Sequence, residues 1–171
     1  SSDGSAEMVT SEFPQTRLIV NQNNAGYPRA NNQGLMTFGF PGVDTRSASP
    51  SYALLLNPDT EVPADGIAKM LGFMGEHPDA GIAGPKLVRL DGTLDLACRR
   101  SFPTPEVSFH RIVGLSRLFP RSRRFARYNL TYLDPDEMVE VDAVVGAFML
   151  VRGSAISQVG LLDDHFFMYG E

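Results

Sequence analysis

The stretch Tyr52-Ala53-Leu54-Leu55-Leu56-Asn57-Pro58-Asp59-Thr60 decides the predicted fold. Its first five residues are a continuous apolar run, which is typical of a strand buried on both faces of a parallel sheet. The four residues that follow are turn formers and end the strand. Open α/β sheets bind ligands at the carboxyl ends of their strands, so Asp59 lies where a ligand is expected. We therefore predict a central strand over residues 52–56 with a candidate site at its end.

Helices and strands are predicted to alternate on both sides of this strand. The expected helices cover residues 3–13 (capped by Ser2 or Asp3), 30–38, 64–76, 105–119 and 153–159, and the expected strands cover residues 17–20, 52–56, 81–84 and 139–151. The dipeptide Asp91-Gly92 within residues 86–97 is a strong hairpin signal and predicts an antiparallel flap. The alternation favours one α/β domain, with an open, mostly parallel sheet flanked by helices.

Length and composition indicate an ordinary globular domain. The chain has 171 residues, of which 43% are hydrophobic and 20% charged. Cys98 is the single cysteine, so the chain forms no internal disulfide and a reducing compartment is the default expectation. No apolar run approaches the roughly 20 residues that span a bilayer. The chain lacks an initiator methionine and stops in an aromatic stretch, so we interpret both ends as cuts.

The charge is unevenly distributed along the chain. Residues 99–127 contain eight arginines and one acidic residue, Glu106, so this segment has a charge of +7. The rest of the chain has a charge of −12, and the two add to the net charge of −5. These arginines could contact the phosphates of an anionic membrane or of a lipid-linked acceptor, at about 1 kcal/mol each. A solvated helical face is the alternative. Nucleic acid is not an expected partner, because the segment contains no recognition module and the rest of the chain would repel phosphate.

Asp59 is the candidate metal ligand. A carboxylate at a strand end can bind Mg²⁺ or Mn²⁺, and the ion can neutralise a diphosphate as it departs. The alternative is an ordinary turn, in which the side chain of Asp59 accepts hydrogen bonds from the backbone.

Two further groups of small or amide residues are candidate ligand contacts. A turn and the helix after it contain amides that can read a nucleobase or ribose and glycines that allow close approach, namely Asn24, Gly26, Asn31, Asn32 and Gly34. Gly146 and Ala147 interrupt an otherwise β-branched strand, which indicates that a ligand or a packed helix approaches the backbone. For the first group, the alternative is a glycine turn beside a helix surface.

Acid or base groups are expected near the C-terminus, where Asp163, Asp164 and Glu171 are the candidates besides Asp59. The three histidines are scattered and the cysteine is single, so a zinc site is not expected. The chain contains neither of the glycine-rich phosphate loops, G-x-G-x-x-G or G-x-x-x-x-G-K-[ST]. This absence disfavours dinucleotide dehydrogenases and P-loop phosphotransferases.

Four segments match known motifs in the right order. Residues 1–5 resemble the end of DNxSxDGS, residues 24–34 resemble NxGfaxaxNxG, and residues 55–60 resemble llNPDt, a form of the metal-binding DxD motif. Residues 141–171 resemble VDxvxGAfmlvRr…vGgfDexFFmYgED. Taken together, the chain resembles family 2 glycosyltransferases of the rhamnosyltransferase-like bacterial branch over essentially its whole length.

This resemblance implies a GT-A fold and a transfer with inversion, in which an acceptor hydroxyl attacks the donor sugar while a metal-bound nucleoside diphosphate leaves. Asp59 would be the ligand of the divalent cation and the diphosphate. Gly146 and Ala147 would border the donor sugar and acceptor, with Asp163 and Asp164 nearby. The implied donor-binding residues are Asp3, Asn24, Gly26, Asn31, Asn57, Asp59, Gly146 and Ala147.

The chain departs from the family pattern at both ends. The usual catalytic base is the aspartate of the final ED pair, and the chain ends on Glu171, which is expected to substitute. Residues 1–171 would form one partial catalytic domain without its first strands. In the implied sheet order, those strands pair with residues 17–20 and 52–56. The isolated chain is therefore expected to fold poorly, to aggregate and to be inactive.

The leading hypothesis is an enzyme that transfers a sugar to a cell-surface polysaccharide or a lipid-linked oligosaccharide. Rhamnose from a deoxythymidine diphosphate donor is the first guess from the branch, and the expected location is the cytoplasm at the inner face of the plasma membrane. A non-catalytic module that keeps the fold to hold a partner is the alternative. A nucleotidyltransferase would also combine an α/β sheet with metal-binding carboxylates.

Overall fold

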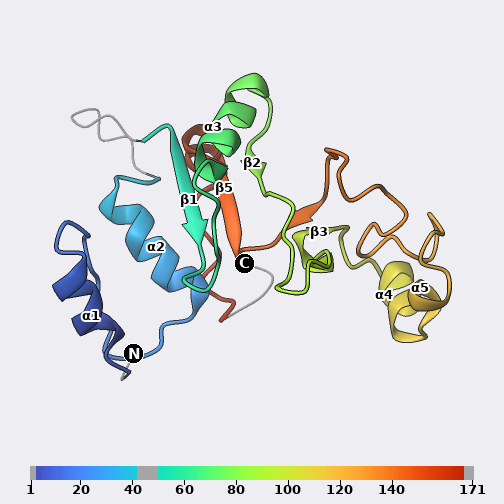
Figure 1. The fold of residues 1–171 in the computed structure, drawn as a ribbon, viewed down its shortest axis with the longest axis horizontal. Helices are drawn as coiled ribbons and strands as arrows, with labels where there is room; N and C mark the ends of the chain where they lie inside the picture. Colours follow the sequence, from blue (N-terminus) through green and yellow to red (C-terminus); the bar gives the residue numbers. More distant parts are fainter. Residues whose placement is uncertain (1–2, 42–49, 168–171) are drawn as a thin grey trace. The chain divides into compact units, whose positions relative to one another are not determined.

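The computed structural model describes residues 3–41 and 50–167, and the chain divides into two compact units. One unit comprises residues 51–155, and the other comprises residues 1–50 together with 156–171. Figure 1 shows the order of the elements along the chain. The division leaves the prediction of a single domain untested.

The main sheet of the 51–155 unit has three strands in the order β1-β5-β2. These are β1 (Tyr52–Leu56), β5 (Phe148–Arg152) and β2 (Ile82–Ala83). Strand β5 is antiparallel to both neighbours, with Leu56 opposite Phe148 and Ile82 opposite Val151. The strand predicted at residues 52–56 therefore forms with its predicted bounds.

Two predictions about this sheet are wrong for the described residues. The sheet is antiparallel rather than mostly parallel, and β1 lies at its edge rather than at its centre. Among the residues of β1, Leu55 is buried and Leu56 is exposed. An apolar run indicates burial but does not determine strand direction, so residues 52–56 alone could not predict the antiparallel pairing of β5 with β1.

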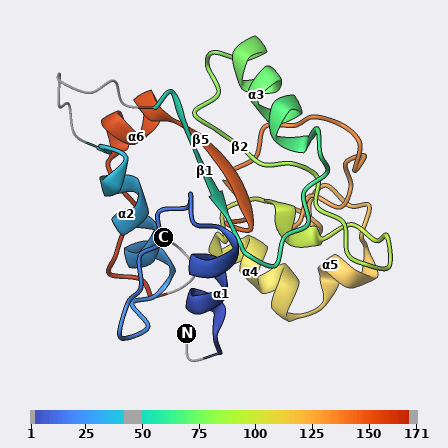
Figure 2. The ribbon, with the colours of Figure 1, turned by 60° about the vertical axis from the view of Figure 1, so that its left-hand side comes forward.

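Helix α3 (Gly66–Glu76) covers this sheet and completes its core. Met74 packs with Ala83, Phe148 and Leu150, all of them buried. Figure 2 shows α3 beside the strands. The helix begins two residues later than predicted and ends where predicted, and Met74 is its buried residue.

A second, two-stranded sheet lies further along the unit. The hairpin predicted in residues 86–97 is confirmed by an antiparallel bridge between Val88 and Leu94. A 3-10 turn, η1 (Leu96–Cys98), leads into β3 (Arg99–Arg100), which pairs antiparallel with β4 (Ala143–Val144). The single strand predicted over residues 139–151 is wrong, because β4 belongs to this sheet and β5 to the other.

The arginine-rich segment contains two short helices instead of the one predicted over residues 105–119. Helix α4 (Pro105–Ile112) begins at Thr104, whose side chain accepts a hydrogen bond from the backbone of Val107. Gly114 then adopts a left-handed conformation, with φ of 80°, and α5 (Leu115–Leu118) follows. A residue in this conformation ends a helix, which explains the break.

The other unit contains α1 (Ser5–Glu12) and α2 (Tyr27–Thr37). Gly4 precedes α1 in place of the predicted cap Asp3, and α2 begins three residues before its predicted start. Residues 17–20 form no strand, since none of the described residues pairs with them. Helix α6 (Gly153–Val159) has its predicted bounds and contains the boundary between the units.

In the described part of the chain, no helix has the length and apolar character needed to cross a membrane.

Candidate functional site

The turn after β1 is tied to the backbone of Ala147. The backbone N–H of Asn57 donates to the Ala147 carbonyl at 2.9 Å, and the hydroxyl of Thr60 donates to the same oxygen at 3.2 Å. A further bond from the N–H of Thr60 to the Asn57 carbonyl, at 3.2 Å, closes the turn. Two segments predicted separately, Asn57 with Asp59 and Gly146 with Ala147, therefore meet in space.

Asp59 lies inside this turn with an exposed side chain. The tied backbone on either side fixes its position, while the carboxylate faces solvent. A single exposed carboxylate suits Mg²⁺ or Mn²⁺, because these ions usually combine one or two protein carboxylates with water and substrate phosphates. The exposed carboxylate of Asp59 is compatible with such an ion, and its role as a metal ligand stays a prediction.

The turn before α2 depends on glycine at position 26. Gly26 is buried and has φ of 82° and ψ of 166°, a conformation that is essentially restricted to glycine. The backbone oxygen of Phe167 would lie 2.6 Å from a Cβ at this position. The same oxygen accepts a hydrogen bond from the backbone N–H of Tyr27 at 3.1 Å. The close approach predicted for Gly26 is thus made by the chain itself.

Asn24 and Asn31 both make local hydrogen bonds. The side-chain oxygen of Asn24 accepts from the N–H of Gly26 at 3.0 Å, and the amide of Asn31 donates to the Tyr27 carbonyl at 2.9 Å. These bonds shape the turn and the first part of α2. The donor-binding role expected for the two asparagines stays a prediction.

Asn32 attaches α2 to the segment that carries the predicted acidic residues. Its amide nitrogen donates to the Leu162 carbonyl at 2.8 Å, and its oxygen accepts from the Leu162 N–H at 3.0 Å. Asn32 is buried, so losing this pair would leave unsatisfied backbone groups. Asn32 was predicted as one of the amides that could contact a nucleobase or ribose, and in this structure both of its side-chain groups are bonded to Leu162 instead.

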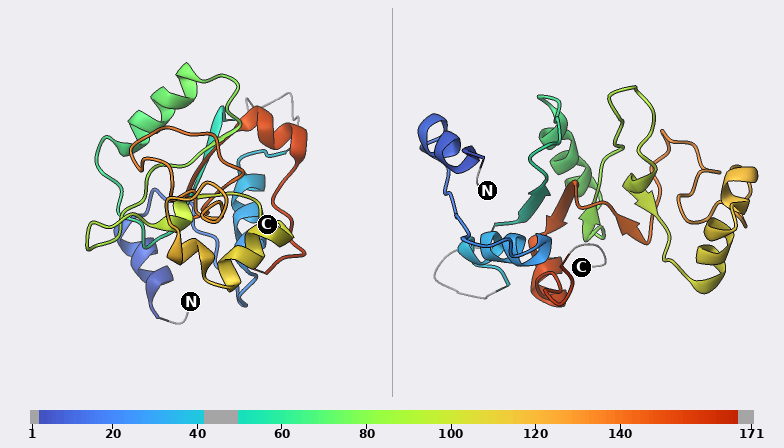
Figure 3. Two further views of the ribbon diagram at one scale, coloured as in Figure 1. Left: turned by 90° about the vertical axis from the view of Figure 1, so that its right-hand side faces the viewer. Right: turned by 90° about the horizontal axis from the view of Figure 1, so that it is seen from below.

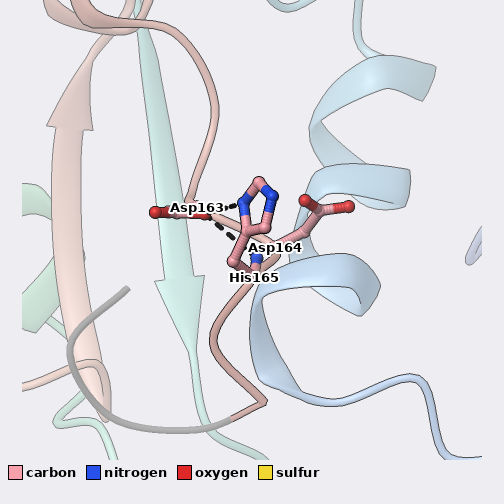
Figure 4. Close-up of side chains that lie close together, drawn as sticks. All are labelled: Asp163, Asp164 and His165. Carbon is pink, nitrogen blue, oxygen red and sulfur yellow. Dashed lines mark hydrogen bonds and ion pairs between the residues drawn. The ribbon is translucent and has the colours of Figure 1, made fainter.

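Asp163, Asp164 and His165 form an exposed cluster on this segment (Figure 4). One ligand atom from each lies within 4.8 Å of the others. Asp164 also forms an ion pair with Arg29 of α2, at 3.5 Å. The two aspartates were predicted, whereas His165 was judged only against the other histidines and was missed. Its position directly after the two acids was the available signal.

Hydrogen bonding within this cluster shifts two pKa values. The backbone N–H of His165 donates to Asp163 at 3.0 Å and its ring nitrogen lies 2.8 Å from the same oxygen, which together lower the pKa of Asp163. The bond to Asp163 raises the pKa of His165, and the negative charges of Asp163 and Asp164 raise it further. The ring therefore gains a proton at higher pH than an isolated histidine.

Asp3 and Glu171 are the other two predicted site residues. Asp3 is exposed and accepts hydrogen bonds from the hydroxyl and backbone N–H of Ser5, which lower its pKa. It serves the start of α1 in this structure. Glu171, the predicted base, lies outside the described residues.

Comparison with known proteins gives relatives along the whole chain. This chain is 28% identical to a protein of Mycobacterium tuberculosis named N-acetylglucosaminyl-diphospho-decaprenol L-rhamnosyltransferase, over 172 aligned residues that cover 100% of the chain. It is 28% identical over 153 residues, or 90% of the chain, to the low-salt glycan biosynthesis hexosyltransferase Agl10 of Haloferax volcanii.

These matches cover only part of each relative. The chain spans 55% of the mycobacterial protein and 42% of the archaeal one, so it corresponds to about half of the relatives that it matches. No family model matches the chain. No solved structure matches it either.

Proposed function

Because this chain is similar to curated glycosyltransferases, we propose that it is part of the catalytic domain of an enzyme that transfers a sugar from a nucleoside-diphosphate donor to a lipid-linked or polysaccharide acceptor. The names of the two relatives support the reaction class, since one is a rhamnosyltransferase and the other a hexosyltransferase of glycan biosynthesis. Rhamnose is the proposed sugar and deoxythymidine diphosphate the proposed carrier. The proposed acceptor is a sugar linked to a polyprenyl diphosphate, as in the name of the mycobacterial relative.

One observation carries this proposal: the turn that holds Asp59 is tied to the Ala147 carbonyl. This contact supports the proposal, because a donor site would combine a metal ligand with backbone that can approach a sugar closely. Asp59 would hold the divalent cation. The cation would supply charge neutralisation for the departing diphosphate.

The chain's own groups would contribute positioning in this reaction. The bonds from Asn57 and Thr60 hold the turn still, which limits the movement of the Asp59 carboxylate. Asp163 and Asp164 are the proposed acidic groups on the acceptor side, and the hydrogen bonds from His165 lower the pKa of Asp163. We propose inversion at the sugar carbon and activity in the cytoplasm, at the inner face of the plasma membrane.

The test is calorimetric titration of the protein with deoxythymidine and uridine diphosphates, with and without Mn²⁺. We expect metal-dependent binding that weakens at least about tenfold in Asp59→Ala, because the ion loses its protein carboxylate. The matched control is Asp79→Ala, which removes another exposed aspartate from a turn of the same unit. It should bind as the unchanged protein does.

Two results would count against the proposal. If a folded protein bound neither diphosphate, the non-catalytic scaffold would become the better hypothesis. If Asp59→Ala bound as tightly as the unchanged protein, Asp59 would not be the metal ligand.

A further inference from the structure

Large apolar side chains are exposed on the outer surface of α4 and α5. Phe109, Ile112 and Leu118 are 58%, 83% and 69% exposed, and Val113 and Phe119 are exposed beside them. Phe109, Ile112 and Val113 are spaced at i, i+3 and i+4, so they share one face. Contiguous apolar surface of this kind is uncommon on a soluble monomer and marks an interaction site.

The opposite face of α4 is already packed. Val107 and His110 are buried, and the ring centroids of His110 and Phe125 lie 4.9 Å apart with the two rings nearly perpendicular. The outer apolar residues are therefore not needed for the core of this region. Figure 3 shows α4 and α5 at the end of their unit, away from the strands β1 and β5.

Several arginines of the same segment have no acidic partner among the described residues. Arg124 pairs with Glu106 at 3.4 Å, but no carboxylate among the described residues pairs with Arg111, Arg117, Arg121 or Arg123. Arg99 is different: it is buried and donates to two backbone carbonyls, so it does not contribute to this surface.

A cavity brings the two kinds of residue together. It has a volume of about 880 Å³, and Arg111, Ile112 and Arg117 all line it. The guanidinium of Arg111 lies 4.0 Å from the centre of the Tyr128 ring, which holds it in place. Cationic groups and an exposed isoleucine therefore face the same space.

We propose that α4 and α5 dock on an anionic lipid bilayer, with Phe109 and Ile112 entering the interface and Arg111 and Arg117 contacting lipid phosphates. Charge complementarity supports this occupant, because Arg111, Arg117, Arg121 and Arg123 pair with no carboxylate among the described residues of a chain whose net charge is −5. Apolar residues beside arginines are typical of segments that lie in the membrane interface. The choice of a bilayer rests on the proposed function, since a lipid-linked acceptor lies in a membrane.

The test is co-sedimentation of the protein with vesicles of phosphatidylcholine alone and of phosphatidylcholine with phosphatidylglycerol, without donor or acceptor. We expect binding to the anionic vesicles that weakens as salt is raised. Replacing Arg111 and Arg117 by glutamine should weaken it about twenty-fivefold, at about fivefold for each arginine. Replacing Arg17 and Lys69 by glutamine changes the net charge equally and should leave binding nearly unchanged.

Ile112→Ser tests the apolar contribution and should weaken binding about tenfold. Its control is Val159→Ser, because Val159 is 84% exposed and lies outside α4 and α5. Equal binding to both kinds of vesicle, or full binding by Ile112→Ser, would overturn the proposal. Self-association through this face without vesicle binding would also overturn it and would indicate a second copy as the occupant.

The two proposals can fail separately. Asp59→Ala should bind vesicles normally if the surface is correct, whatever its effect on the diphosphates. If the protein bound diphosphate with normal metal dependence but did not bind anionic vesicles, the proposed function would be retained and the membrane surface rejected.

Discussion

In the unit that contains α2, the turn before this helix depends on the backbone conformation of a single residue. Gly26 combines a positive φ with a contact that leaves no space for a side chain. The polar residues around it serve the same local structure, since Asn24 closes the turn and Asn32 attaches the helix to Leu162. Many residues that look like ligand contacts in the sequence therefore also hold the chain together.

Gly26→Ala should lower the free energy of unfolding by about 1–3 kcal/mol, because alanine is strained in this conformation. Its Cβ would also lie 2.6 Å from the Phe167 oxygen and force the segment away. Urea denaturation measures the change. The control is Gly34→Ala inside α2, where a Cβ meets nothing within 4 Å.

Gly34→Ala should instead stabilise the protein by about 0.5–1 kcal/mol, because alanine favours a helix interior. The opposite signs separate the two causes. Equal stability of both variants would show that the turn at Gly26 is not under the constraint inferred here.

At the scale of elements, Arg152 connects the sheet to α3. This residue ends β5, and its guanidinium donates to the carbonyls of Met74, His77 and Ala80 and to the hydroxyl of Tyr52. Two of these carbonyls belong to the C-terminal end of α3, where a positive charge also interacts favourably with the helix dipole. The arginine of the GAFMLVR segment thus has a structural role.

Arg152→Met should destabilise the protein by about 2–3 kcal/mol, because four acceptors lose a charged donor while the apolar stem is kept. Thermal and urea unfolding both report this loss. Arg124→Met removes an exposed ion pair with Glu106 and should cost less than about 0.5 kcal/mol. A comparable loss in the two variants would mean that the bonds of Arg152 contribute little.

For the whole molecule, exposed apolar segments bear on solubility. Leu18, Ile19 and Val20 are all exposed, and no described residue pairs with them as a strand. The edge of β1 away from β5 also has no strand partner in the described part of the chain. Both features are open to pairing with other chains. The expectation that the isolated chain folds poorly and is inactive stays a prediction.

Val20→Lys should raise the concentration at which the protein self-associates, because a charge on an apolar segment opposes strand addition. Light scattering against protein concentration measures the onset. Met36→Lys adds the same charge on α2, where Met36 is 54% exposed, and should change the onset less. An unchanged onset in Val20→Lys would place the self-association elsewhere.

The sequence by itself determined the local features of this protein. Strand β1 and helix α6 have their predicted bounds, because the limits of such short segments depend on neighbours in the chain. The hairpin at Asp91-Gly92 follows in the same way from local turn preferences. The motif order also identified the glycosyltransferase relatives, which cover the whole chain.

Only the tertiary structure decided what these elements contact. The antiparallel direction of β5, the division of residues 139–151 between two sheets and the absence of a strand at residues 17–20 all depend on partners distant in sequence. The same holds for the contact of Ala147 with the Asp59 turn. Pairing is a contest among all available strands, and its outcome depends on the free energy of the whole unit rather than on any single segment.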